Sequence, residues 1–461
     1  MIAESLHDNE LHSPVHNADL SANPDELKQI THDILAQARS LGADAAEAEV
    51  SMGIGQNVSV RKGEVETIEY NRDKGASVTL YFGKQRGNAS SSDLSAQALR
   101  DTVQAAASIA RYTAADEFSG LADEDLLARG DIADLELYHP WDISVEESIE
   151  LARRTEAAAF AVDKRITNSE GASVSTHEAS FVYANSLGFC DGFASSRHGL
   201  SCSVIAGKDD GMQRDYWYTT ARDAGTLDAP EHVGQMAGER TVARLDARKL
   251  STRDAAVLFD PAQAAALIGH FVSAASGGSL YRKSSFLLDS LGKQVFAPLI
   301  QIREQPHMRG ALASSAFDDE GVATRERDVV KDGVLQGYFL GSYSARKLGM
   351  RSTGNAGGNH NLIVRSGDLD FGGLIRKMHA GLVVTELLGH GVNPVTGDYS
   401  RGAAGFWVEN GEIRYAVEEI TIAGNLVEMF RNIVAVGSDV LVRGSKQCGS
   451  ILIGQMTIAG E

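Results

Sequence analysis

The alternation of apolar and polar positions divides the chain into helical and extended segments. Asn23-Pro24-Asp25-Glu26 is typical of a helix start, with a side-chain cap followed by proline, and apolar residues then recur at helical spacing. Between residues 58 and 82 the period changes to two, broken at Gly63 and Gly75, which predicts an antiparallel meander. A second helix is expected over residues 93–111, where it would cover one face of that sheet.

The middle of the chain repeats this order of elements. Residues 122–142 are acidic and irregular, which suits a long surface connection. A capping box then begins a helix predicted over residues 144–162, and strands are expected from 167 to 220 with a turn at Asn185–Gly188. A further helix is predicted from Pro230 to about Arg248.

The remainder of the chain is strand-rich, and its glycines are predicted to lie in turns at Gly333, Gly354, Gly357, Gly358, Gly397, Gly405 and Gly411. Because helices and strands do not alternate regularly, the pattern favours an α+β fold with antiparallel sheets flanked by helices. We expect an N-terminal α/β part followed by a strand-rich C-terminal domain. The predicted division is a flexible tail, an N-terminal domain, a central domain and a C-terminal domain at residues 1–22, 23–121, 122–248 and 249–461.

Composition limits the classes of partner. The 461 residues carry 43 basic and 62 acidic side chains, a formal charge of 43 − 62 = −19, which argues against direct binding of nucleic acid. Three cysteines are too few for a disulfide framework, so a reducing compartment is expected. The longest uncharged run, residues 261–280, is too weakly apolar to span a membrane, and the acidic N-terminus resembles no signal peptide. We therefore expect a cytoplasmic protein without a membrane partner.

The common catalytic signatures are missing from the sequence. It contains no phosphate-binding G-x-x-x-x-G-K-[ST], no G-x-G-x-x-G after a predicted strand, and no nucleophile elbow. His177-Glu178 could begin a zinc-binding H-E-x-x-H motif, but the position of its second histidine is Phe181. Because the segment alternates like a strand, this pair is expected to face solvent.

One turn-rich loop, residues 385–402, concentrates unusual polar residues, including a glutamate, a histidine, an asparagine, an aspartate, a tyrosine and an arginine. Loops of this kind are where binding residues gather. They can equally be structural, with Asn, Asp and Thr side chains satisfying the loop's own backbone. Both interpretations remain open on composition, and the candidate residues are His390, Asn393, Tyr399 and Arg401.

Read together with other segments, this loop resembles the TldD/PmbA family of two-subunit metalloproteases, and within it the PmbA branch, also called TldE. The segments that carry the resemblance are Phe317–Val322, Gly333–Tyr338, Ser352–Gly358, Gly391–Gly402, Phe406–Gly411 and Glu419–Leu426, together with a hairpin at Glu66–Gly75. The resemblance runs from about residue 25 to the end of the chain. It implies the family's fold and a place in a peptide-cleaving assembly.

The resemblance also locates a degenerate metal motif. The catalytic branch carries H-E-x-x-x-H on a helix, and anchoring on Arg282-Lys283 places its three functional positions at Gly269, His270 and Ala274. Glycine and alanine offer no donor atom to zinc. Cys448 is a loose positional match to a cysteine ligand of the catalytic branch. We therefore expect no metal in this chain, with zinc in a partner subunit.

The family resemblance implies that this chain is the non-catalytic partner of a TldD-like subunit, with a homodimer possible when it is alone. The assembly would cleave unfolded or modified peptides, as in peptide-antibiotic maturation and antitoxin breakdown. In that setting Arg401 would take a peptide carboxylate, and Tyr399 and Asn393 would bond to peptide backbone. The alternative is a non-enzymatic binding or regulatory protein that acts on DNA gyrase indirectly. Hydrolysis by this chain alone ranks last, because no nucleophile and base can be paired.

Overall fold

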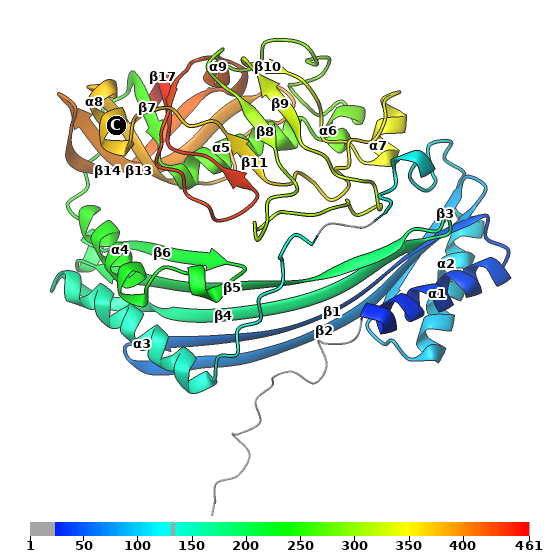
Figure 1. Ribbon diagram of the computed structural model, residues 1–461. Helices are drawn as coiled ribbons and strands as arrows, with labels where there is room; N and C mark the ends of the chain where they lie inside the picture. Colours follow the sequence, from blue (N-terminus) through cyan, green and yellow to red (C-terminus); the bar gives the residue numbers. More distant parts are fainter. Residues whose placement is uncertain (1–23, 131–133, 461) are drawn as a thin grey trace, which may run out of the picture.

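The computed structural model describes residues 24–130 and 134–460. Figure 1 shows a long curved sheet beneath a second, more compact body of strands and short helices. The helix predicted to start at Asn23 is present from Pro24, while the proposed cap itself and residues 1–22 lie outside the described residues. No helix in the described ranges is both long and apolar enough to cross a bilayer.

The long sheet has six strands in the order β3-β2-β1-β4-β5-β6, all antiparallel. Its strands are β1 (Ala45–Arg61), β2 (Glu64–Phe82), β3 (Gln85–Ser91), β4 (Ile166–Asn185), β5 (Cys190–Ala206) and β6 (Gln213–Ala221). Because β1 pairs with β4, segments on both sides of the predicted boundary at 121/122 share one sheet. The predicted domain boundaries stay predictions.

Four helices cover the two ends of one face of this sheet: α1 (Pro24–Ser40), α2 (Ala96–Tyr112), α3 (Val145–Val162) and α4 (Pro230–Ala243). The even-numbered residues of β1 point to this face, so Ala46 and Val50 join a core with α1 and α2, and Val60 joins one with α3 and α4. The opposite face turns toward the C-terminal body. The capping box predicted at Ser144 is confirmed, since its hydroxyl and the Glu147 carboxylate cap each other's backbone N–H.

The C-terminal body contains two sheets. The first, in the order β14-β13-β12-β7-β17-β15, is formed by β7 (Arg253–Phe259), β12 (Gly381–Leu388), β13 (Asp398–Glu409), β14 (Glu412–Asn425), β15 (Ile433–Val436) and β17 (Ile451–Ala459). The second, in the order β10-β9-β8-β11-β16, is formed by β8 (Ile302–Glu304), β9 (Arg327–Lys331), β10 (Val334–Leu335), β11 (Leu362–Val364) and β16 (Lys446–Gln447). Five helices complete it: α5 (Pro261–Ala274), α6 (Gly277–Tyr281), α7 (Ser342–Lys347), α8 (Phe371–Met378) and α9 (Leu426–Arg431). The predicted α+β class is confirmed.

Some local predictions were wrong. Gly75 does not break the meander but lies inside β2, opposite Ser51. Gly405 lies inside β13, where a Cβ would come within 1.8 Å of the Val383 carbonyl oxygen, so the glycine allows close approach of two strands. The helix predicted to reach Arg248 ends at Ala243. Glu178 is buried and accepts a hydrogen bond from Tyr138 Oη at 2.7 Å, so it does not face solvent, although His177 does.

Candidate functional site

The loop between β12 and β13 holds itself together through its own polar side chains. Asn393 Oδ1 accepts a hydrogen bond from the Val395 N–H at 2.9 Å, and the Asp398 carboxylate accepts from Thr396 Oγ1 at 2.6 Å. Asn425 Nδ2, at the end of β14, donates to Asp398 at 3.1 Å. The Asn393 side-chain oxygen is therefore used within the loop, while the His390 side chain is exposed.

Two of the candidate residues, Tyr399 and Arg401, lie on β13 and approach the helix α5. The Tyr399 ring is 2% exposed and meets His270 of α5 edge to face, with ring centroids 6.0 Å apart. Among the described residues its hydroxyl has no hydrogen-bond partner, and burial raises the pKa of Tyr399 to about 12. Tyr399 thus packs against the candidate metal motif and does not reach the surface.

The Arg401 side chain is partly exposed and makes few polar interactions. Its Nε donates a long hydrogen bond of 3.4 Å to the Leu388 carbonyl, and no ion pair involves it within the described ranges. The carboxylate of Glu386 pairs with Arg244, so it does not brace Arg401. Burial, and then the charge of Arg401, lower the pKa of His270, which keeps that imidazole neutral.

Of the three metal-motif positions, only His270 offers a donor atom for a metal. Ala274 is buried in the core at the last residue of α5, and a Cβ on Gly269 would lie 3.7 Å from Lys446 Cε. Cys448 is fully buried with its Sγ donating to the Gly449 carbonyl oxygen at 3.1 Å, and burial raises the pKa of its thiol well above the usual range. Zinc is bound by three or four thiolate, neutral imidazole or carboxylate groups, whereas this chain has a single imidazole at the motif and places Arg401 and Lys446 beside it.

Within residues 24–130 and 134–460, no three His, Cys, Asp or Glu side chains form a group that could hold one metal ion. One imidazole with two basic side chains beside it does not match the three or four donor atoms that zinc needs. We call the group formed by His270, Tyr399, Arg401 and Lys446 the α5 cationic cluster. Lys446 was missed by sequence reasoning, because only the tertiary contact of β16 with α5 places it there.

Comparison with known proteins assigns the family. Profiles of the PmbA/TldA metallopeptidase domain 1, central domain and C-terminal domain match residues 46–110, 138–245 and 252–460. The chain belongs to the PmbA/TldD metallopeptidase family. It is 54% identical over 419 residues to the metalloprotease PmbA of Escherichia coli O157:H7, covering 91% of this chain and 93% of that protein. A PmbA homolog of Haemophilus influenzae is 49% identical over 445 residues, covering 96% of this chain and 98% of that protein.

Solved structures agree with this assignment. A Bacteroides thetaiotaomicron protein designated a modulator of DNA gyrase superposes with a TM-score of 0.90 at 28% identity, covering 95% of this chain and 99% of that chain. TldE of Thermococcus kodakarensis superposes with a TM-score of 0.83 at 20% identity, covering 94% of this chain and 100% of that chain. The long sheet and the C-terminal body are thus the architecture of PmbA/TldD proteins.

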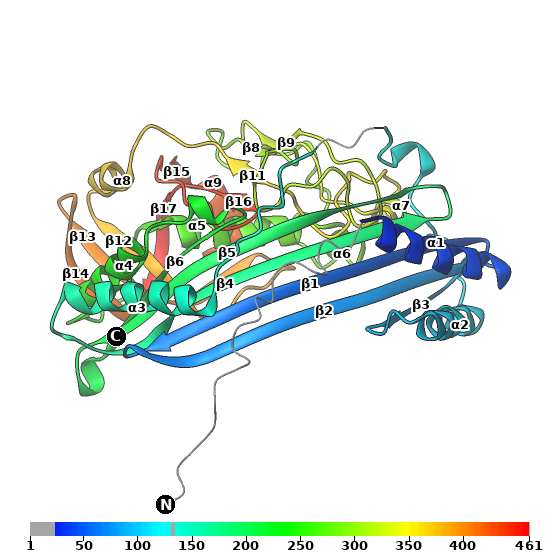
Figure 2. The same cartoon turned by 60° about the horizontal axis from the view of Figure 1, so that its bottom comes forward.

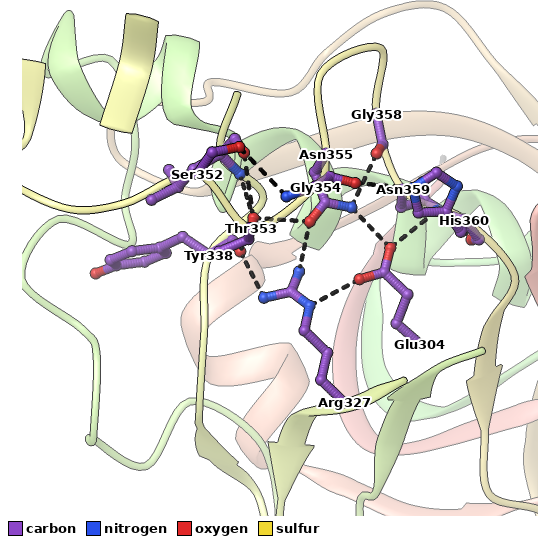
Figure 3. A network of polar contacts seen from close by, with 11 residues as sticks. Glu304, Arg327, Tyr338, Ser352, Thr353, Gly354, Asn355, Gly358, Asn359 and His360 are labelled. Carbon is purple, nitrogen blue, oxygen red and sulfur yellow. Dashed lines mark hydrogen bonds and ion pairs between the residues drawn. The ribbon is translucent and has the colours of Figure 1, made fainter. Parts of the chain in front are cut away.

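One of the family-like segments, Ser352–Gly358, is part of a buried polar network (Figure 3). The Glu304 carboxylate of β8 accepts hydrogen bonds from Arg327 Nε, Asn355 Nδ2 and the His360 N–H, each at 2.8 Å. Arg327 also donates to the Tyr338 carbonyl at 2.8 Å and to Asn355 Oδ1 at 3.0 Å. In this PmbA/TldD chain the segment therefore stabilises the fold and carries no exposed reactive group.

The N-terminal end of α5 links the C-terminal body to the long sheet. The Asp260 carboxylate caps α5 by accepting from the Gln263 N–H at 2.9 Å, and it lies 3.7 Å from the Arg240 guanidinium of α4. Arg240 is also 3.3 Å from Asp215 of β6. Burial nevertheless raises the pKa of Asp260 to about 6. The loss of hydration raises the pKa by more than the hydrogen bond from Gln263 and the charge of Arg240 lower it.

We expect Asp260 to make the unfolding free energy depend on pH. Its unfolded pKa is about 4, so between about pH 4 and 6 the folded chain binds a proton that the unfolded chain releases. This contribution is present at low pH and is lost as the pH rises through 6. Asp260→Asn keeps the cap acceptor, so it should remove this slope, about 1.4 kcal/mol per unit of pKa difference.

The measurement is urea unfolding of both chains at several values from about pH 4 to pH 8, which spans the two pKa values of Asp260. Asp370→Asn is the matched control, because Asp370 caps α8 in the same way, accepting from the Gly373 N–H at 2.7 Å, but is exposed. A wild-type profile parallel to that of Asp260→Asn would show that Asp260 is ionised throughout.

Proposed function

We propose that this chain is the non-catalytic subunit of a two-subunit peptide-cleaving assembly, in which a TldD-like partner carries the zinc. The observation that supports the proposal is the α5 cationic cluster. At the position where the catalytic branch has its metal motif, this chain carries a glycine and a buried alanine, with two cationic side chains beside them. Such a site repels a divalent cation and cannot activate water through one.

In this proposal the chain forms part of the wall around the enclosed active site and supplies groups that bind an extended peptide. Arg401 is the candidate for a peptide carboxylate, since its guanidinium has no acidic partner among the described residues. The face of the long sheet that turns toward the C-terminal body carries a polar cavity of about 460 Å³, lined among others by Asn57, Ser59, Thr67 and Ser201. Its hydroxyl and amide groups suit hydrogen bonding to unfolded or modified peptide backbone.

Activity should appear only when the two kinds of subunit are mixed. We expect this chain alone, after mild chelation, to carry well under one zinc ion per molecule and to leave an unfolded peptide intact. Adding a TldD-like subunit should give cleavage that a chelator abolishes. The measurements are elemental analysis and peptide turnover for each chain and for the mixture.

Stoichiometric zinc in the chain alone, lost on His270→Ala or Cys448→Ala, would contradict the proposal.

The second candidate function, a non-enzymatic regulator acting indirectly on DNA gyrase, is favoured by the designation of the Bacteroides thetaiotaomicron structure. The formal charge of −19 makes direct contact with DNA unfavourable. A mixture that forms a complex but cleaves no faster than the TldD-like subunit alone would favour this second function.

A further inference from the structure

A polar pocket lies where the long sheet meets the C-terminal body. Its volume is about 570 Å³, and it is lined mainly by residues 218–223 at the end of β6, 309–312 and 441–443. Figure 1 shows β6 as the strand of the long sheet nearest the C-terminal body, and Figure 2 shows it beside α4. Ligand sites commonly have volumes of roughly 300–1,000 Å³ and lie at such junctions. We call this cavity the β6 pocket.

Three arginines at the β6 pocket have no acidic partner. Arg222 and Arg443 line the pocket. Arg197 donates to two groups at its margin, the Thr220 hydroxyl at 3.1 Å and the Arg443 carbonyl at 3.3 Å. Among the described residues, none of the three arginines forms an ion pair with a carboxylate. Because the chain has a formal charge of −19, carboxylates are abundant, and their absence here indicates an anion from outside the chain.

The Arg443 guanidinium is held in place without being neutralised. Its Cζ lies 3.9 Å from the ring centroid of Trp217 and 4.0 Å from that of Tyr218. It donates no hydrogen bond to the described residues, and its Nη2 is fully buried. Burial lowers the pKa of Arg443, whereas a bound anion would raise it. A ligand would therefore meet a positive charge that two aromatic rings already orient, so little side-chain entropy would be lost on binding.

Arg222 holds one wall of the β6 pocket. Its Nε donates to the Ala311 carbonyl at 3.1 Å, and its Nη2 donates to the Leu312 carbonyl at 2.9 Å. Its Nη1 donates to the Ser196 carbonyl at 3.1 Å. Carbonyl oxygens satisfy these donors but leave the charge in place, and burial, and then the charge of Arg197, lower the pKa of Arg222.

The carboxylates that line the β6 pocket do not cancel these charges. Glu136, Asp223 and Asp228 are all exposed, and Glu136 pairs with Arg309 at 2.9 Å. Asp223 accepts a hydrogen bond from the Gly225 N–H at 2.8 Å. Charges in contact with water are screened more strongly than charges that are partly buried. The inner part of the pocket therefore attracts anions.

We propose that the β6 pocket binds a carboxylate of an acidic peptide, with Arg443 as the residue that contacts it. A guanidinium can donate two parallel hydrogen bonds to the two oxygens of a carboxylate. The Thr220 hydroxyl accepts from Arg197, so its own proton is available to the same ligand. The carboxylate can belong to an Asp or Glu side chain or to the C-terminus of the peptide. The inference rests on the proposed function, because it takes the ligand to be a peptide and names its class.

Calorimetric titration of the full chain, without a TldD-like subunit, tests binding and identifies the source of the carboxylate. The first probe is Ala-Ala-Glu-Ala-Ala with both ends blocked, and the second is Ala-Ala-Gln-Ala-Ala with a free C-terminus. The neutral control is Ala-Ala-Gln-Ala-Ala with both ends blocked. We expect one or both acidic probes to bind about tenfold or more tightly than the control, and more weakly as salt is added.

Variants locate the site. Arg443→Gln should weaken binding of the acidic probe about tenfold or more, and Arg197→Gln should weaken it several-fold. Asp228→Asn should strengthen it several-fold, because the charge of Asp228 acts on Arg443. Arg154→Gln is the matched control, since Arg154 pairs with Glu231 at 2.7 Å on the helix-covered face and should have no effect. The melting temperature checks folding, and Arg197 is exposed, so its variant tests the pocket even if Arg443→Gln unfolds.

Four results would overturn the inference. The first is an acidic probe that binds no more tightly than the neutral control. The second is inorganic phosphate binding more tightly than either acidic probe, which would assign a phosphate site. The third is binding that neither Arg443→Gln nor Arg197→Gln weakens. The fourth is binding weakened by Arg401→Lys alone, which would place the carboxylate at Arg401.

The failure of this inference is distinct from the failure of the proposed function. Any of the four results would leave cleavage by the mixed subunits unexplained by the β6 pocket but would not contradict that cleavage. A mixture that cleaves no peptide would count against the proposed function, whereas binding of the acidic probe to this chain alone would still support the β6 pocket.

Discussion

Replacing Arg327 with methionine should lower the free energy of unfolding by about 3–5 kcal/mol, the usual cost of removing one partner from a buried ion pair. The Glu304 carboxylate, whose side chain is 2% exposed, would keep its hydrogen bonds from Asn355 and His360 but lose its counter-charge. The Tyr338 carbonyl and Asn355 Oδ1 would lose donors as well. Urea unfolding followed by circular dichroism measures the change.

Arg303→Met is the matched control for this prediction. Arg303 lies next to Glu304 and pairs with Glu326 at 3.0 Å, but these side chains are 53% and 49% exposed. Its loss should therefore cost less than about 1 kcal/mol. Combining Glu304→Gln with Arg327→Met should recover part of the stability, because no charge is then left buried. If Arg303→Met and Arg327→Met lowered the free energy of unfolding equally, the buried ion pair would contribute no more to stability than the exposed one.

Replacing Arg401 with lysine should reduce peptide cleavage by the mixed assembly roughly tenfold or more, while leaving the melting temperature and subunit association unchanged. A guanidinium binds a carboxylate through two parallel hydrogen bonds, which the single ammonium of lysine cannot reproduce. A hydrogen bond to a charged group contributes roughly 1.5–3 kcal/mol, which corresponds to about 10- to 150-fold in rate. Little stability should be lost, because Arg401 makes only one long bond, of 3.4 Å, to the Leu388 carbonyl.

Arg414→Lys controls for the loss of any arginine on this sheet. Arg414 lies on the neighbouring strand β14 and pairs with Glu412 at 3.0 Å in an exposed position. Turnover, melting temperature and complex formation should be measured on one preparation of each variant. Unchanged turnover with a lowered melting temperature for Arg401→Lys would assign Arg401 to structure and remove it from the binding residues.

Most helices and strands follow from local signals that tertiary contacts do not override. The helix at Ser144 begins where its capping box predicts, because cap and backbone satisfy each other within one turn. Two of the errors concern glycine. At Gly75 and Gly405 the residue lies within a strand, and at Gly405 it makes room for the Val383 carbonyl of β12. A glycine signals either a turn or a close approach, and only the neighbouring strand distinguishes them.

The candidate site could be predicted only in pieces. Asn393 serves its own loop, an alternative that the sequence left open. The family resemblance indicated His270 and the loop composition indicated Tyr399, but their contact joins α5 to β13 across more than a hundred residues of sequence. The sequence around Lys446 does not indicate a place in the site, since an isolated lysine is common on protein surfaces. Its place beside Gly269 depends on how β16 packs on α5.

The pairing of β1 with β4 also has a consequence during synthesis of the chain. β1 pairs with β4, which lies more than a hundred residues later in the sequence: Val60 pairs with Ala172, and Glu47 pairs with Asn185. When the nascent chain has left the ribosome only as far as the end of α2, the edge of β1 that later pairs with β4 is therefore still unpaired. Part of the outer edge of β2 is unpaired as well. Such long-range pairing is slow to form and leaves strands open to wrong partners. The sheet can be completed only after β4 leaves the ribosome, so folding of the N-terminal third must wait for the middle of the chain.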